Sequence, residues 1–145
     1  MHRFAIALAA LLAAASAGAE VTVQDAWVRA TVPGQKSSGA FMQLTSTTDV
    51  TLVGARSPVA GVVEIHEMAM DANMTMRMRA VQGIPLPAGK PVALKPGGYH
   101  VMLLDLKEPM QAGQKVKLRL LLKDAKGEMD DVDVEVMVKP LNAKL

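Results

Sequence analysis

The chain has 145 residues, and its 16 Lys and Arg against 14 Asp and Glu give a formal net charge of +2. This near balance excludes a strongly basic nucleic-acid-binding protein, and the aromatic content of 3% leaves too few rings for stacking on single-stranded nucleic acid. The absence of Cys excludes disulfides, thiolate zinc sites, iron–sulfur clusters and cysteine nucleophiles. Half of the residues are apolar, which is sufficient for one domain with a packed core.

The first segment has the features of a secretory signal peptide. Arg3 supplies the basic start, Phe4–Ala15 is an apolar run too short to span a bilayer permanently, and Ala17–Ala19 fits a small-x-small cleavage site. We therefore expect a leader at residues 1–19, export to the periplasm, and no membrane span after cleavage.

The rest of the chain, residues 20–145, is expected to form one domain of short strands. Apolar and polar residues alternate in most segments, and turn-forming residues separate them. The expected strands are Glu20–Ala30, Ala40–Thr45, Asp49–Ala55, Val62–Met68, Met74–Val81, Val92–Leu94, Tyr99–Leu104, Lys115–Lys123 and Asp131–Val138. Pro85–Gly89 is expected to interrupt the strand pattern. The pattern predicts an all-β, antiparallel Greek-key β-sandwich.

After removal of the leader, two histidines remain, and each has a methionine two residues later. His66 precedes Met68 and His100 precedes Met102, so each pair shares one face of its strand. Three more methionines alternate between them: Met74, Met76 and Met78. Imidazole and thioether are neutral, soft-to-borderline donors, which suit Cu(I) or Ag(I) far better than Zn, Mg or Ca.

Each of these residues also has an ordinary structural explanation. A single His on a strand is usually a hydrogen-bonded or surface residue, and Met usually fills gaps in a core. Core packing is the expectation for Met42, Met110, Met129 and Met137. It suits the methionines of residues 68–78 less well, because their polar neighbours indicate an exposed hairpin, where thioethers gain little from packing and are easily oxidised. The residue types alone leave both explanations open.

The spacing of these residues resembles the signature of periplasmic copper chaperones of the PCuAC type, H-(M)-x(10)-M-x(21)-H-x-M. Here His66 is the first histidine, and Glu67 and ten further residues separate it from Met78. Another twenty-one residues separate Met78 from His100, and Met102 follows two positions later. The optional Met after the first His is Glu67. The resemblance extends over nearly all of the chain after the leader.

The resemblance implies a cupredoxin-like β-sandwich that binds one Cu(I) through His66, Met78, His100 and Met102. It also implies delivery of copper toward the Cu-A centre of cytochrome c oxidase, with that oxidase domain and assembly factors as partners. We expect the protein to be a monomer. Met76 shares the face of Met78 on an ideal strand, so Met76, and also Met68, stay open as alternative ligands.

Nearby charged residues have less specific expectations. Glu64, Glu67 and Asp71 are close to the site in sequence; solvated carboxylates are the expectation, and hydrogen bonding to an imidazole is the alternative. Arg77 and Arg79 should point away from the metal-binding face.

The sequence also bears on two other function classes. No Ser-His-Asp order, HExxH motif or glycine-rich phosphate loop is present, so we expect no enzymatic activity. A copper-tolerance or storage protein, or a sandwich that binds other proteins without metal, remain the alternatives. Metal ligation by His predicts that Cu(I) affinity falls as the pH drops through the His pKa.

Overall fold

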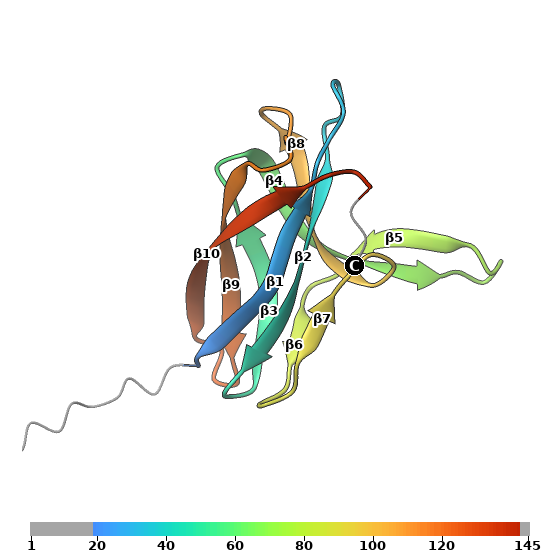
Figure 1. Cartoon of the computed structure of the whole chain (residues 1–145). Coiled ribbons are helices and arrows are strands. Elements are labelled where there is room, and N and C mark those ends of the chain that lie inside the picture. The colour runs from blue at the N-terminus through green and yellow to red at the C-terminus, as the bar shows by residue number, and fades with distance from the viewer. Residues whose placement is uncertain (1–18, 143–145) are drawn as a thin grey trace, which may run out of the picture.

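The computed structural model describes residues 19–142, and every regular element among them is a strand (Figure 1). The strands are β1 (Val21–Arg29), β2 (Ser38–Ser46), β3 (Val50–Arg56), β4 (Ala60–Met70), β5 (Met76–Ala80), β6 (Ile84–Leu86), β7 (Val92–Leu94), β8 (Tyr99–Leu106), β9 (Lys115–Asp124) and β10 (Met129–Lys139). No helix long and apolar enough to cross a membrane occurs in these residues. The expected leader, residues 1–19, lies outside them except for its last residue and stays a prediction.

The strands follow one hydrogen-bonded path in the order β5-β4-β8-β2-β1-β10-β9-β3-β6, and β7 adds to β2. This path folds over on itself, so that β3 contacts β4 and two layers face each other (Figure 1). The expected all-β sandwich is therefore confirmed. One detail differs from a purely antiparallel sheet, because β1 and β10 run parallel where they pair, from Trp27 opposite Met137 to Arg29 opposite Lys139.

A bulge in β1 allows this strand to serve both layers. The register with β2 shifts between Gln24 and Trp27, where Asp25 has a positive φ of 53°. Before the bulge β1 pairs with β2 alone, and after it β1 pairs with both β2 and β10. The added twist that a bulge introduces fits a strand at the turn from one layer into the other.

The core is built from alternate residues of the strands, as the period of two requires. Along β9 the residues Val116, Leu118, Leu120 and Leu122 are buried, while the intervening Lys and Arg are exposed. Met42 and Met110 lie in this core, as expected. Met129 and Met137 do not; the expectation of core packing was wrong for both, since they lie on the outward-facing side of β10.

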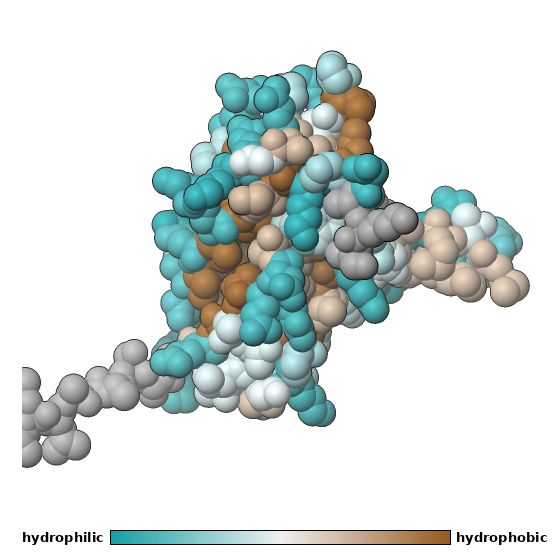
Figure 2. Space-filling model, viewed as in Figure 1, coloured by the Kyte–Doolittle hydropathy of each residue, from teal (hydrophilic) through white to brown (hydrophobic). Residues whose placement is uncertain are grey.

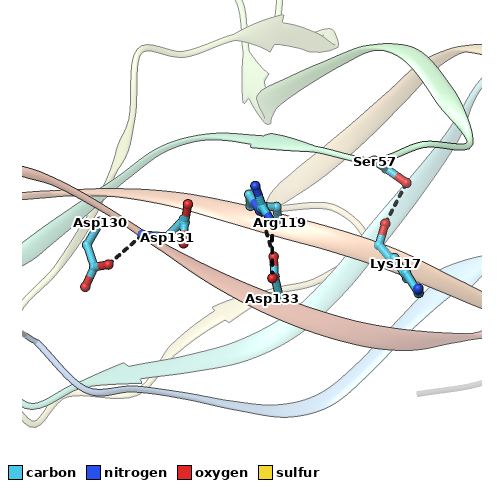
Figure 3. A network of polar contacts seen from close by, with 6 residues as sticks. All are labelled: Ser57, Lys117, Arg119, Asp130, Asp131 and Asp133. Carbon is cyan, nitrogen blue, oxygen red and sulfur yellow. Dashed lines mark hydrogen bonds and ion pairs between the residues drawn. The ribbon is translucent and has the colours of Figure 1, made fainter.

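The outer face of β9 and β10 carries two pairs of opposite charges, of which Figure 3 shows Arg119 with Asp133. Arg119 pairs with Asp133 directly across the strands, with Nε donating to Oδ1 at 2.8 Å, and Lys115 lies 3.3 Å from Glu135. The hydrogen bond from Arg119 lowers the pKa of Asp133. Such exposed pairs contribute little to stability because water and salt screen them, so this face is a solvated surface with weak cross-strand attraction.

β6 contains Pro85 and was not expected as a strand. Pro85 pairs with Thr51 of β3, and β6 is the last strand on the hydrogen-bonded path. An edge strand has one row of backbone groups that needs no partner, which is the position in a sheet that tolerates proline. The expectation that Pro85–Gly89 interrupts the strand pattern was therefore wrong for its first two residues.

Candidate metal centre

The two histidines lie side by side at the base of a projecting hairpin. β4 and β5 form the hairpin, which extends beyond the sandwich, while the first part of β4 pairs with β8 (Figure 1). In that pairing His66 is directly opposite His100, and the ring centroids are 5.8 Å apart. Their neighbours Ile65 and Val101 point the other way, into the core, so the alternation that buries the core turns both imidazoles to one outer face.

A hydrogen bond from each histidine fixes which ring nitrogen is free. His66 Nε2 lies 2.6 Å from Glu64 Oε2, and an ionised carboxylate only accepts, so Nε2 carries the hydrogen. His100 Nδ1 lies 3.3 Å from the carbonyl oxygen of Gly98, which also only accepts. The lone pairs therefore lie on His66 Nδ1 and His100 Nε2.

These two lone-pair nitrogens are both buried, and neither has a hydrogen-bond partner among the described residues. A buried polar atom without a partner costs about 1–3 kcal/mol, so its persistence needs an explanation. A metal ion that lies roughly 2 Å from one nitrogen of each ring fits between rings whose centroids are 5.8 Å apart. The pair thus fits a shared metal ion.

The surroundings favour the neutral form of His100. It is 4% exposed, and this burial lowers its pKa, which the hydrogen bond to Gly98 raises and the neighbouring His66 lowers further. A neutral imidazole is the form that binds metal. His100 therefore stays competent to bind a metal below the pH at which an exposed histidine becomes protonated.

The pairing places the expected thioether ligands at two different sides of the histidines. Met102 lies next to His100 on the same face of β8 and opposite Glu64 of β4. Met78 is opposite Met68, one step outward from His66 along the hairpin. All of these residues share one face of the β5-β4-β8 sheet, so the sequence-expected set His66, Met78, His100 and Met102 is gathered on it.

Met76 lies farther from the histidines than Met78 does. It is opposite Met70, four residues beyond His66, which corresponds to about 13 Å along the strand. Met68 lies only two residues from His66. The register therefore places Met78 nearer to the imidazoles than Met76. Met68 is a neighbour of both His66 and Met78.

An aromatic row that the sequence did not indicate lies beside His100, on the β2 side of the site. Phe41 of β2 lies 6.0 Å from the His100 ring and 4.7 Å from Trp27 of β1. A Cβ added to Gly39 would meet the Phe41 ring at 3.0 Å, so the missing side chain gives the ring its place. Arg29 covers Phe41 and Trp27 from outside, 5.6 and 5.7 Å from their centroids.

The reverse face of the hairpin carries ion pairs in place of thioethers. Glu67 pairs with Arg79, and Asp71 with Arg77, which confirms that both arginines point away from the histidine face. The hydrogen bonds from Thr75 and Arg77 lower the pKa of Asp71. Within residues 19–142 no three His, Cys, Asp or Glu side chains are grouped to hold a metal, so a site here needs the thioethers.

Glu64 makes a contact that was expected from the sequence only as the alternative, a hydrogen bond to an imidazole. Three nearby carboxylates were expected to be solvated, and this was wrong for Glu64, which binds His66. The sequence could have predicted this contact, because Glu64 and His66 are two residues apart on one strand and so share a face.

One protein family and one curated protein are similar to this chain in sequence. The family described as "Putative lipoprotein LpqE-like" matches residues 21–138. The protein named "Putative lipoprotein Lxx21020" from Leifsonia xyli subsp. xyli is 35% identical over 104 residues, which is 72% of this chain and 63% of the relative. The chain thus spans a little under two thirds of that protein.

Solved structures share the fold. Apo-DR1885 from Deinococcus radiodurans, solved in solution, is 32% identical, covers 88% of this chain and 86% of its own, and superposes with a TM-score of 0.59. Its CuI form is 29% identical, with coverages of 83% and 76% and a TM-score of 0.53. The copper-bound PCuAC domain from PmoF2, 22% identical with coverages of 83% and 92%, has a TM-score of 0.66. These matches confirm the cupredoxin-like β-sandwich and the resemblance to PCuAC domains; the chain belongs to the LpqE-like family, which is of the PCuAC type.

Proposed function

We propose that the protein is a non-enzymatic copper chaperone that holds one Cu(I) through His66, Met78, His100 and Met102. The observation that carries the proposal is that His66 Nδ1 and His100 Nε2 are both buried without partners among the described residues, on rings whose centroids are 5.8 Å apart. Cu(I) prefers such neutral donors to carboxylate or water. The related CuI-DR1885 was solved with this ion, which supports the same cargo here.

The donor set suits transfer as well as binding. Both imidazoles are held by hydrogen bonds, while Met78 is 47% exposed on the hairpin. A thioether on an exposed strand is the ligand that an incoming donor of a partner can displace most easily. The histidines then keep hold of the ion until the partner has taken it.

The cellular role follows from export and cargo together. The curated relative carries the word lipoprotein in its name, which fits the signal peptide expected at residues 1–19. We propose a periplasmic domain at residues 20–145 that delivers Cu(I) toward the Cu-A centre of cytochrome c oxidase, with the oxidase domain and assembly factors as partners. Copper tolerance or storage is the competing role.

A competition titration tests the site. The mature protein and its His66→Ala, Met78→Ala, His100→Ala and Met102→Ala variants are titrated with Cu(I) against a chromophoric Cu(I) chelator under reducing, anaerobic conditions. Each variant should lose more than about tenfold in affinity, the lower end of what supporting residues around a metal contribute. Met129→Ala, at an exposed methionine outside the site, is the control. Full affinity in the His100→Ala variant would rule out the proposed ligand set.

A transfer assay tests the role. The Cu(I)-loaded protein is mixed with the apo Cu-A domain of an oxidase from the same cell, and the metal content of the two is measured after separation. Delivery predicts that copper moves to the Cu-A domain, while a storage protein would keep it. Deletion of the gene should correspondingly lower oxidase activity at limiting copper rather than growth at excess copper.

A further inference from the structure

The tip of the β4–β5 hairpin is a turn that the chain builds twice. At the tip, the Asp71 amide donates to Thr75 O at 2.9 Å and the Met74 amide to Asp71 O at 3.0 Å. Asp71 Oδ1 accepts from the amides of Asn73 and Thr75, at 2.9 and 3.0 Å. The turn is a three-residue loop whose last residue lies in the left-handed region, and here that residue is Met74, with a φ of 60°.

The β9–β10 hairpin repeats this turn bond for bond. The Asp124 amide donates to Glu128 O at 2.9 Å, and the Gly127 amide to Asp124 O at 3.0 Å. Asp124 Oδ1 accepts from the amides of Lys126 and Glu128, both at 2.9 Å. The left-handed position is held here by Gly127, with a φ of 82°. At the same position of the same turn, one hairpin therefore has a glycine and the other has a methionine.

Methionine is an unfavourable choice at a left-handed position, because its Cβ crowds the backbone. Such residues persist where the side chain serves another purpose, and an observed outlier is a reason to look for one. Packing is not that purpose, because Met74 is 78% exposed. Solvent exposure also leaves the thioether open to oxidation.

Met74 is the outermost member of a series of thioethers that leads to the histidines. Next to the turn, Met70 and Met76 are cross-strand partners, 58% and 46% exposed, and Met68 and Met78 form the following pair. His66 comes next on the same face. Figure 2 shows this moderately hydrophobic surface along one side of the projecting hairpin and hydrophilic surface along the other.

We propose that Met70, Met74 and Met76 form a second, weaker soft-metal site at the hairpin tip, which takes up Cu(I) and passes it to the centre at His66 and His100. The proposal rests on the proposed function and adds the route by which the cargo arrives. At each step one thioether–metal bond breaks as another forms, and the ion stays monovalent. The thioethers at the tip are neutral, and Arg77 already neutralises Asp71, so no fixed charge holds the ion there.

Ag(I) is the probe, because it is soft, monovalent and does not change oxidation state. The full mature protein, labelled with ¹³C at the methionine methyl groups, is titrated with Ag(I) and followed by NMR. The methyls of Met78 and Met102 should shift up to one equivalent, and those of Met70, Met74 and Met76 between one and two equivalents. In a His66→Ala/His100→Ala variant the tip methyls should shift from the first addition.

Met74→Gly removes the tip thioether and keeps the turn, since Gly127 occupies the equivalent position. This variant should bind the second Ag(I) at least about tenfold more weakly and load the centre more slowly, with an unchanged affinity at the centre. Met129→Ala is the control. Sedimentation of the two-equivalent sample should show a monomer, because a metal-bridged dimer would overturn a site within one chain.

The outcomes separate the two proposals. If the resonances of the tip methyls do not shift when Ag(I) is added beyond one equivalent, this inference is wrong, and the copper-chaperone function is unaffected. An unchanged second affinity in Met74→Gly would also overturn it. Neither set of methyls shifting would mean that the proposed function itself is wrong.

Discussion

At the scale of single residues, the site depends on two hydrogen bonds that select a tautomer. Glu64 fixes the hydrogen on Nε2 of His66, and the Gly98 carbonyl fixes it on Nδ1 of His100. The Gly98 carbonyl also accepts from the Met68 amide at 3.2 Å, so the backbone that continues the β4–β8 pairing orients the second ring as well. Outer partners of this kind raise ligand basicity and hold ring orientation.

Glu64 and Glu67, three residues apart and on opposite faces of β4, provide a matched test. Glu64→Ala should weaken Cu(I) binding about 10–100-fold, because His66 then loses its fixed tautomer and orientation. Glu67→Ala removes a carboxylate that pairs with Arg79 on the reverse face and should leave the affinity unchanged. The chelator competition measures both, and equal effects would show that charge alone matters.

The lowered pKa of His100 predicts how the stability of the apo protein depends on pH. In the unfolded chain His100 titrates near 6.5, whereas in the fold burial lowers its pKa. Below pH 6.5 the unfolded state therefore binds more protons, so the free energy of unfolding decreases as the pH falls from 7.5 to 5.5. Urea unfolding at several pH values should show this slope for the apo protein and a smaller one for His100→Asn. Asp71 and Asp133 do not interfere, because their lowered pKa values act only near and below pH 3.8.

At the scale of elements, the hairpin contrasts with the sheet from which it emerges. Its residues from Ala72 to Ala80 are all exposed, so cross-strand pairs and ion pairs hold it together rather than a core. Segments with few buried contacts open locally at low free-energy cost. A hairpin that opens in this way lets a partner reach Met78 while the two histidines at the base stay paired within the sheet.

The duplicated turn gives a stability prediction in both directions. Met74→Gly should stabilise the hairpin by about 1 kcal/mol, the lower end of the cost of a left-handed residue with a side chain. Gly127→Ala should destabilise the other turn by a similar amount. Hydrogen exchange at the amides that close each turn, Thr75 and Glu128, measures the two effects separately. Opposite signs are expected, and matching signs would contradict the equivalence of the turns.

At the scale of the whole molecule, core and site share the same strands. Ile65 and Val101 face inward where His66 and His100 face outward, so metal binding and core packing stabilise one pairing. A ligand that binds only the folded state adds RT ln(1 + [L]/Kd) to stability, about 2.7 kcal/mol at a hundredfold excess over Kd.

This linkage predicts that metal can compensate for a core defect. Leu103→Ala, at a fully buried position of β8, should lower the free energy of unfolding by about 2–5 kcal/mol. Added Ag(I) should restore about 2.7 kcal/mol at a hundredfold excess over Kd. The Leu103→Ala/His100→Ala variant should recover at most about half of this, because the same Ag(I) concentration is then no more than about tenfold above the weakened Kd. Urea unfolding with and without metal measures each case, and equal recovery in both would place the bound ion elsewhere.

The sequence predicted most strands, and it predicted that each histidine shares a strand face with the methionine two residues later, because alternation along a strand is a local property. It did not predict that His66 would be directly opposite His100, since register depends on pairing between segments more than thirty residues apart. It missed β6 because proline argues against a strand except at an edge, and which strand forms an edge is decided by the whole topology. The sequence also did not indicate that Phe41 lies beside His100, because this proximity depends on the pairing of β2 with β8.

The direct opposition of His66 and His100 also ties copper handling to correct folding. A slip of one residue between β4 and β8 would turn one histidine inward and present Ile65 or Val101 in its place. A misassembled chain would then offer a single imidazole, which grips a soft ion far less well than two. Metal occupancy would thus mark those molecules in which the sheet has formed in its native alignment, and a partner that accepts only loaded protein would in effect accept only folded protein.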